Sequence, residues 1–398
     1  MHPTESLKAT KGRELLGKKI VLGITGSIAA MESFELAREL IRHGAEVHAV
    51  LSEDAAKLVT PWTMEFATGN PVIEVIDGKV QHVAFFGDHP QKADLLLISP
   101  CTANTLSKIA CGIADTPVTT MAMVALGTAT PVMMAPAMNL AMYHNPLVQA
   151  NFGRLSEAGV ETIGPRVEGK KAKVAETDEI VERVIRRLGK RDLLGSRILV
   201  IGGSSEEPID AMRVITNRGS GETGVALARA AFERGAEVEL WMGRCQVAIP
   251  SFLPLKRFST VEDLMGMAAS IDHDIVIVPA ALSDYAPERA KGKLSSKKAT
   301  RTLQLKCLPK VVDVIATRKV RLVTFKAEHG LDERELARCA RERLDQGQVE
   351  FVVANDLASV GAKETKAFIV RKDGSRTRFE GSKTDLAHLV LDELVQGG

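Results

Sequence analysis

The sequence predicts an α/β protein built from two doubly wound, Rossmann-like domains with parallel sheets. Its 398 residues, 45% of them hydrophobic, are more than one compact core holds, so we expect two domains of about two hundred residues each. Both halves open with an apolar strand that ends in glycine, followed by a helical pattern and a second strand. The phrases HGAEV at 43–47 and RGAEV at 234–238 stand at the same place in each half, which supports two similar α/β units.

Composition narrows the class of protein. The chain has 52 Lys and Arg against 50 Asp and Glu, a formal charge of +2, which argues against a nucleic-acid or membrane-surface binder. Its five cysteines form no CxxC pair, so we expect reduced thiols in a cytoplasmic protein, without a zinc or disulfide framework. The first twenty residues are polar and predict no signal peptide. The longest apolar stretch, Met121–Ala137, is interrupted by Gly, Thr and Pro and predicts no membrane span.

Strands and helices alternate through the first half. The helical spacing within Ala175–Arg191 predicts the last helix of this domain and a short linker. We therefore expect domains at residues 1–190 and 191–398. The predicted strands of the first domain are Lys19–Thr25, Glu46–Leu51, Asp94–Ser99 and Pro131–Ala135.

The turn after the first strand predicts a phosphate site. It reads Gly-Ile-Thr-Gly-Ser-Ile and lacks the GxGxxG fingerprint of dinucleotide sites. Gly26 with the hydroxyls of Thr25 and Ser27, leading into a helix, suits a single terminal phosphate. The third and fourth strands also run into small polar loops, at 100–105 and 136–142, and all three loops should meet at one edge of the sheet.

The second half differs in one respect. An insertion at residues 204–221 separates Gly203, at the end of strand Arg197–Ile201, from the next helix, and strand Glu237–Trp241 follows that helix. Doubly wound sheets bind ligands at the carboxyl ends of their strands. We therefore expect the function of this domain to concentrate in the insertion.

The first half carries a resemblance. Its segments ITGSIAA, PCTANT and PAMNLAMY resemble the FMN-containing cysteine decarboxylases over about residues 18–188, and PAMNxxM is the most specific match. The resemblance implies a flavodoxin-like flavoprotein domain in which His82 acts as acid and base beside the flavin, while Asn139 and Met142 contact the substrate. The FMN-binding positions it implies are Gly26, Ser27, Ser52, Ser99, Thr102, Ala103 and Asn104.

The match has departures. Cys101 and Thr102 stand where the family usually has alanine and serine, and Tyr143 replaces a tryptophan. Many members also carry a cysteine, thought to protonate the enethiolate, in a flap that corresponds to 164–173 here. This stretch is shortened and has no cysteine. Lys171, Lys173 and water stay open as proton donors.

The second half resembles the phosphopantothenate–cysteine ligases over nearly all of 193–398. The matching segments are GGSSEEPID at 202–210, RVITNRGSG at 213–221, AALSDY at 280–285, Lys293-Leu294, LPK at 308–310 and VANDL at 353–357. The two families that these halves resemble catalyse consecutive steps of one pathway. Together they imply a bifunctional phosphopantothenate–cysteine ligase and phosphopantothenoylcysteine decarboxylase of coenzyme A synthesis.

The ligase resemblance also implies site residues. Asn217 would contact an acyl-cytidylate, Arg213 the substrate, and Lys293 the charge that develops during nucleotidyl transfer. Asp284 would orient the nucleotide or its Mg²⁺. Glu222 stands where bacterial relatives have a lysine, which leaves the choice between CTP and ATP open. The CTP-binding positions it implies are Ala280, Asp284, Lys293, Pro309, Lys310, Val311, Val312 and Phe325.

Two other functions remain as alternatives. A nicotinamide-dependent oxidoreductase would need a GxGxxG fingerprint, whose glycines are absent here, and an acidic residue about twenty positions further on that binds the ribose. A regulatory flavoprotein that has lost decarboxylase turnover is favoured only by the missing flap cysteine. The expected partners are phosphopantothenate, cysteine and CTP, with no nucleic acid and no membrane. The resemblance implies trimeric flavin domains and dimeric ligase domains, so we expect a homo-oligomer.

Overall fold

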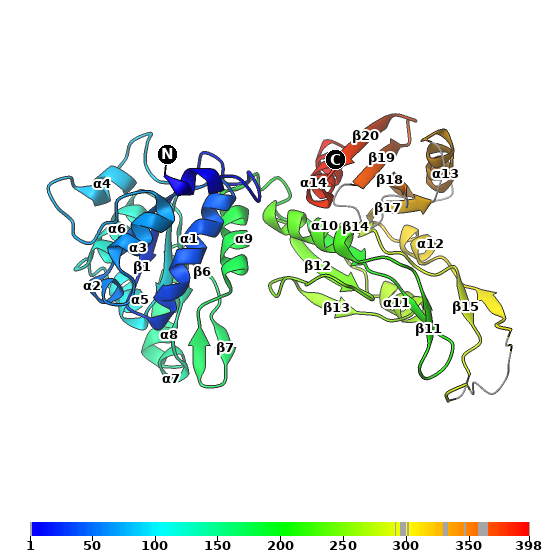
Figure 1. Cartoon of the computed structure of the whole chain (residues 1–398), viewed down its shortest axis with the longest axis horizontal. Helices are drawn as coiled ribbons and strands as arrows, with labels where there is room; N and C mark the ends of the chain where they lie inside the picture. The colour runs from blue at the N-terminus through cyan, green and yellow to red at the C-terminus, as the bar shows by residue number, and fades with distance from the viewer. Residues whose placement is uncertain are drawn as a thin grey trace. The chain divides into compact units, whose positions relative to one another are not determined.

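The structure is a computed structural model that describes residues 2–290, 292–294, 300, 302–328, 333–345, 348–356 and 365–397. Leu357, the last residue of the VANDL motif, lies outside the described residues. The chain separates into two compact units, 1–189 and 190–398. In both units a parallel sheet is covered by helices on its two faces (Figure 1).

Unit 1 has the strand order β2-β1-β3-β4-β6, all parallel. This is the flavodoxin-like order, in which the direction of strand addition across the sheet reverses between β1 and β3. A smaller antiparallel sheet, β5-β8-β7, follows it. The strands are β1 Lys19–Ile24, β2 Glu46–Leu51, β3 Leu95–Cys101, β4 Val132–Pro136, β5 Met138–Asn139, β6 Glu161–Thr162, β7 Arg166–Glu168 and β8 Lys171–Lys173.

Alternate residues of β1 bury into two different cores, which explains its nearly continuous apolar sequence. Ile20, Leu22 and Ile24 lie in one core, and Val21 lies in the other. Each fully buried side chain of this size contributes about 1.5–3 kcal/mol to folding. The helices are η1 Pro3–Leu7, η2 Ile28–Glu32, α1 Ser33–Arg42, α2 Glu53–Ala56, α3 Pro61–Thr68, α4 Gln81–Phe86, α5 Ala103–Ala110, α6 Pro117–Gly127, α7 Leu140–Tyr143, α8 Pro146–Glu157 and α9 Thr177–Leu188.

Unit 2 has the strand order β13-β12-β9-β14-β17-β18-β19-β20. The first six strands of this order, from β13 to β18, are parallel and follow the order typical of Rossmann folds, with the reversal between β9 and β14. The last two strands are antiparallel and extend the sheet. The strands are β9 Arg197–Gly202, β12 Glu237–Met242, β13 Leu255–Arg257, β14 Ile275–Val278, β17 Arg321–Glu328, β18 Val349–Asp356, β19 Thr365–Arg371 and β20 Arg376–Gly381.

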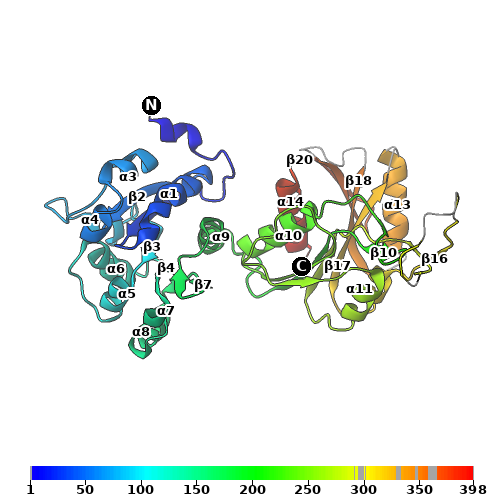
Figure 2. The ribbon, with the colours of Figure 1, turned by 60° about the horizontal axis from the view of Figure 1, so that its bottom comes forward.

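The two faces of this sheet are also covered. On one face α10 and α14 pack together, and α11, α12 and α13 cover the other face (Figure 2). The helices are α10 Glu222–Glu233, α11 Val261–Ala268, α12 Val311–Ala316, α13 Glu333–Asp345 and α14 Lys383–Gln396. Two antiparallel hairpins are added to the parallel sheet, β10 Glu206–Pro208 with β11 Val214–Thr216, and β15 Tyr285–Pro287 with β16 Leu305–Cys307.

The prediction of two doubly wound α/β units is confirmed. The predicted strands named above agree with β1–β4, β9 and β12 within two residues at each end. The helix predicted within 175–191 is α9. Among the described residues, no helix is both long enough and apolar enough to cross a bilayer.

Candidate active sites

Two loops of unit 1 are tied together at the point where the strand order reverses. The Thr25 hydroxyl, just after β1, donates a hydrogen bond of 2.7 Å to the carbonyl of Pro100 in β3. It also accepts one of 3.0 Å from the backbone N–H of Thr102. The first and third strand ends therefore form one rigid edge, as the sequence predicted for this ligand-binding position.

Small hydroxyl residues at this edge begin three helices. Ser27, Ser52 and Thr102 are the N-caps of η2, α2 and α5, and each side chain accepts a hydrogen bond from its helix backbone. Ala103 and Asn104 form the first turn of α5, and Ser99 is buried near the end of β3. Gly26 is required by close approach, because a Cβ there would lie 2.4 Å from Cβ of Asp54.

Asn139 reaches the same edge through β4. Pro136 at the end of β4 pairs with Cys101, and Asn139 follows in β5. Its side-chain oxygen accepts a hydrogen bond of 2.9 Å from the N–H of Ala141 and caps α7. Met142 lies in α7 and is half exposed.

The shortened flap folds back on this motif. It forms the hairpin of β7 and β8, and β8 pairs with β5 so that Lys171 lies opposite Asn139. Opposite residues of an antiparallel pair project from the same face of the sheet. Lys173, two residues on, forms an ion pair with Glu168. Of the two lysines left open by the sequence, Lys171 is the one beside Asn139.

His82 lies in a helix rather than after a strand. It is the second residue of α4, which begins after Val80 in a left-handed conformation. The family resemblance places this histidine after a short strand, but the described segment 70–80 has only a single bridge, at Ile73. Helix α4 packs against α6. The His82 Nδ1 atom is buried and has no hydrogen-bond partner among the described residues.

Cys101 is too deeply buried to serve as the missing proton donor. Its side chain has no exposed area, and burial raises the pKa of its thiol to about 12. A protonated, buried thiol behaves as a small apolar side chain. Cys101 is therefore a packing residue of β3.

Unit 2 has a cavity of about 820 Å³ at the point where its strand order reverses. The loops after β9 and β14, the start of α10 and the start of α12 line it. The predicted residues Asn217, Ala280, Asp284, Pro309, Lys310, Val311, Val312 and Phe325 are all among its lining residues. Asn355 of the VANDL motif also lines it. Further lining residues that the sequence did not indicate are Thr324, Lys326, Cys339, Glu342, Arg343, Thr365 and Lys383.

The loop after β9 is held against the loop after β14. The Asn217 amide donates a hydrogen bond of 2.9 Å to the carbonyl of Ala281. Ser205, which is fully buried, accepts one of 3.0 Å from the N–H of Ser283. These contacts fix the position of Asn217 at the cavity.

Asp210 and Arg213 anchor the segment that carries Lys293. Asp210 accepts hydrogen bonds from Arg213 and from the N–H of Leu294, and Arg213 also donates to the Leu294 carbonyl at 2.8 Å. These donors hold the pKa of Asp210 well below its usual range. Lys293 is exposed and does not line the cavity. Arg213 thus contacts the lysine segment, and the substrate contact that its motif implied stays a prediction.

Asp284 and Lys310 form an ion pair at the cavity. Helix α12 begins at Val311 with Lys310 as its N-cap, so Pro309 precedes the helix. Among the described residues, no cluster of three His, Cys, Asp or Glu ligands includes Asp284. Mg²⁺ commonly uses one or two carboxylates together with substrate phosphates, which is compatible with a single Asp284.

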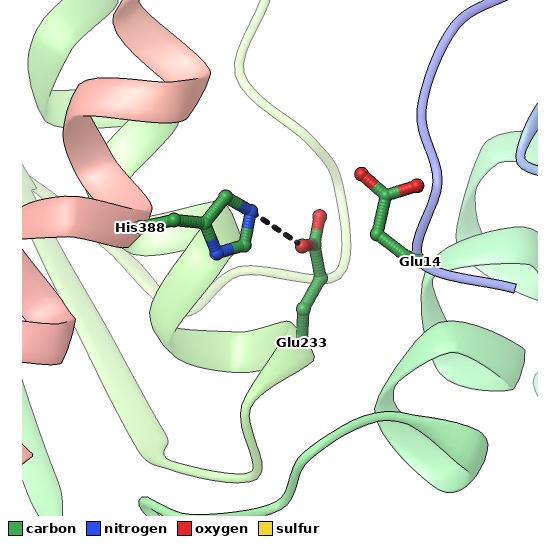
Figure 3. A group of neighbouring side chains, drawn as sticks. All are labelled: Glu14, Glu233 and His388. Atoms are coloured by element: carbon green, nitrogen blue, oxygen red, sulfur yellow. Dashed lines mark ion pairs between the residues drawn. The ribbon is translucent and has the colours of Figure 1, made fainter. Parts of the chain in front are cut away.

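Glu222 is paired with a lysine from the far end of the chain. Lys383 at the start of α14 forms an ion pair with Glu222 at the start of α10, and both line the cavity. A second ion pair joins the same two helices, between His388 and Glu233 at 3.5 Å (Figure 3). The start of α10, where Glu222 replaces the usual lysine, therefore has the ammonium group of Lys383 beside it.

Two protein families match the two units of the chain. The Flavoprotein family matches residues 8–189, and the DNA/pantothenate metabolism flavoprotein C-terminal domain matches residues 193–397. The chain is therefore a flavoprotein joined to that C-terminal domain.

Relatives match the whole chain. The coenzyme A biosynthesis bifunctional protein CoaBC of Thermococcus kodakarensis is 46% identical over 402 residues, which cover 99% of each chain. That of Methanocaldococcus jannaschii is 37% identical, over 99% of this chain and 97% of the relative. The chain belongs to the family of coenzyme A biosynthesis bifunctional proteins. A solved C-terminal domain of a CoaBC protein is 26% identical over 52% of this chain and 97% of its own, with a TM-score of 0.44.

Proposed function

We propose that the protein catalyses two consecutive steps of coenzyme A synthesis. Residues 191–398 join cysteine to 4′-phosphopantothenate with CTP, and residues 1–190 decarboxylate the product to 4′-phosphopantetheine with FMN. The observation that carries this proposal is the match to bifunctional relatives over 99% of both chains. A ligand-binding edge at the reversal of each sheet supports it.

In the ligase half, the substrate carboxylate attacks the α-phosphate of CTP and displaces pyrophosphate, and the amine of cysteine then attacks the acyl-cytidylate and releases CMP. The added negative charge needs fixed cations and donors. Lys293, on its anchored segment, supplies the cation, and the Asn217 amide contacts the mixed anhydride. Asp284 orients the nucleotide with Mg²⁺, and Phe325 lies against the base.

In the decarboxylase half, the residues present fit a flavin. The capped loops at Ser27, Ser52 and Thr102 offer hydroxyl and N–H groups for a phosphate, and the buried Nδ1 of His82 lacks a partner in the described structure. FMN, when bound, would accept a hydride and so oxidise the substrate thiol to a thioaldehyde, the electron sink for decarboxylation, and would return the hydride after CO₂ is lost. His82 moves the proton, and Asn139 holds the substrate carboxylate.

Assembly and location belong to the same proposal. We expect closed trimers of flavin domains, which would bring flavin-site residues from neighbouring subunits together. We expect the ligase domains to form dimers. The five unpaired cysteines, of which Cys111 and Cys307 are exposed, favour a reducing cytoplasm.

The test supplies purified protein with phosphopantothenate, cysteine, Mg²⁺ and either CTP or ATP. Pyrophosphate, CO₂ and the flavin spectrum are followed in parallel. We expect both products with CTP, and we expect His82→Asn to abolish only CO₂ release. Lys293→Gln should abolish pyrophosphate release, and its CO₂ release should return when phosphopantothenoylcysteine is added directly. Protein that binds FMN and forms pyrophosphate but releases no CO₂ would favour a regulatory flavoprotein instead.

A further inference from the structure

Thr324 is a buried polar residue at a position where the sheet offers it no partner. Its side chain is 3% exposed, in β17 between β14 and β18. Its in-register neighbours are Val278 and Val352, whose side chains cannot hydrogen-bond. Among the residues that the structure describes, the Thr324 hydroxyl has no hydrogen-bond partner. An unsatisfied buried hydroxyl costs roughly 1–3 kcal/mol of stability, so packing alone would favour valine.

The cavity explains the position of this hydroxyl. Strand β14 ends at Val278, beside Thr324, and the chain then leaves the sheet at Pro279 and Ala280. All four residues line the cavity. A ligand in the space beyond the end of β14 would therefore contact the Thr324 hydroxyl.

The cavity surroundings favour a nucleotide as that ligand. Val261 and Val311 line it near the Thr324 face of the sheet and belong to the same core as Val278. Five cationic residues line the remaining parts: Arg218, Lys310, Lys326, Arg343 and Lys383. An apolar wall beside several cations suits a molecule with a flat base and several phosphates.

We propose that Thr324 is a nucleotide-binding residue whose hydroxyl forms a hydrogen bond with a polar atom of the bound nucleotide, on its nucleoside or on its phosphates. The identity of the nucleotide rests on the function proposed above. The role of the hydroxyl depends only on a ligand in this cavity. Ligand binding satisfies a group that the free protein leaves unsatisfied, so the hydroxyl contributes to affinity and not to folding.

The test is calorimetric titration of the full-length protein with CTP and Mg²⁺, together with its ligand-free Tm. Thr324→Val keeps the shape and removes the hydroxyl. We expect its Kd for CTP to rise about 5- to 100-fold, with a ligand-free Tm equal to or above that of the unmodified protein. Thr324→Ser keeps the hydroxyl, and its Kd should stay within about threefold of the original.

A matched control separates affinity from folding. The buried Thr119 hydroxyl in unit 1 donates to the carbonyl of Thr116 at 3.1 Å, so Thr119→Val should lower the Tm and leave the Kd for CTP unchanged. Titration with cytidine and with inorganic triphosphate shows which part of the nucleotide contacts Thr324. The proposal is overturned if Thr324→Val binds CTP as tightly as the unmodified protein, or if it lowers the ligand-free Tm.

The nucleotide itself is tested separately. If the unmodified protein binds ATP and not CTP, the proposed nucleotide is wrong, and the same comparison of variants is made with ATP. An equal Kd for the unmodified protein and Thr324→Val in that titration overturns the role of Thr324.

Discussion

Lys171 lies directly opposite Asn139 in the antiparallel pairing of β8 with β5, so both side chains project from one face of the small sheet. The shortened flap has no cysteine, yet it brings an ammonium group beside the asparagine that is expected to hold the substrate carboxylate. Lys173, on the same strand, is engaged by Glu168.

The first prediction concerns these two lysines. If Lys171 donates the proton, Lys171→Met should lower formation of 4′-phosphopantetheine about 100-fold, the range of a lost general acid. Lys173→Met is the matched control and should change the rate less than about threefold. Thiol product and CO₂ are measured in the same sample. If both variants keep the rate of the unmodified protein, neither lysine is the donor, and water is the remaining candidate.

The second prediction concerns Asp210, which fastens the Lys293 segment. Asp210→Asn weakens the contacts with Arg213 and Leu294, so pyrophosphate release should fall about 10- to 100-fold, while CO₂ release from added phosphopantothenoylcysteine stays unchanged. A ligase rate unaffected by this change would separate Asp210 from the positioning of Lys293.

Asp210 also has a predictable pH dependence. Its pKa in the folded protein is lowered, chiefly by Arg213 and then by the N–H of Leu294. Its contribution to stability is therefore complete above the unfolded pKa of about 3.9 and is lost as the pH falls below that value. The difference in Tm between the unmodified protein and Asp210→Asn should be constant from pH 8 to 5 and shrink below about pH 4.

The third prediction concerns Gly26. Gly26→Ala would place a methyl group 2.4 Å from Cβ of Asp54, which forces the β1 and β2 loops apart. We expect a loss of roughly 1–3 kcal/mol in stability and less bound flavin per chain, measured by absorbance after gel filtration. Gly153→Ala, in α8 with nothing within 4 Å of the new methyl, should keep its flavin and gain up to about 1 kcal/mol.

The fourth prediction concerns thiol reactivity. Burial raises the pKa of Cys101 to about 12, whereas Cys111 and Cys307 are exposed. A thiol reagent at pH 8 should label Cys111 and Cys307 in the native protein, and Cys101 only after denaturation. Peptide mapping by mass spectrometry identifies the labelled residues. Rapid labelling of native Cys101 would contradict its burial.

The fifth prediction concerns the ion pair of Lys383 with Glu222. Lys383→Met leaves an unpaired carboxylate at the cavity, where it repels phosphate groups. We expect the KM of a phosphate-bearing ligase substrate to rise about 10-fold. Glu222→Gln should change it less, and the double variant should recover part of the loss. Strictly additive effects of the two changes would mean that the pair does not act as a unit.

The positions of both sites could be predicted from the sequence because each depends on local signals. Gly26 and Gly203 mark where strands end, and parallel strands put their loops at one edge. The helix that carries His82 was not predicted, because its segment VQHVAFF is short, and short apolar runs do not distinguish helix from strand.

Contacts between distant segments were not predictable. Lys383 is 161 positions from Glu222, and no spacing rule joins them. The anchoring role of Asp210 and Arg213 depends on Leu294, about eighty positions further on. Thr324 reads as an ordinary strand residue, because threonine is common in strands, and only the missing partner distinguishes it.

The break between the two compact units after Gly189 has a consequence for production in the cell. Because the peptide bond to Lys190 links them, every passage of a ribosome yields one copy of each catalyst. Their amounts stay equal without any matching of expression, and neither half accumulates without the other.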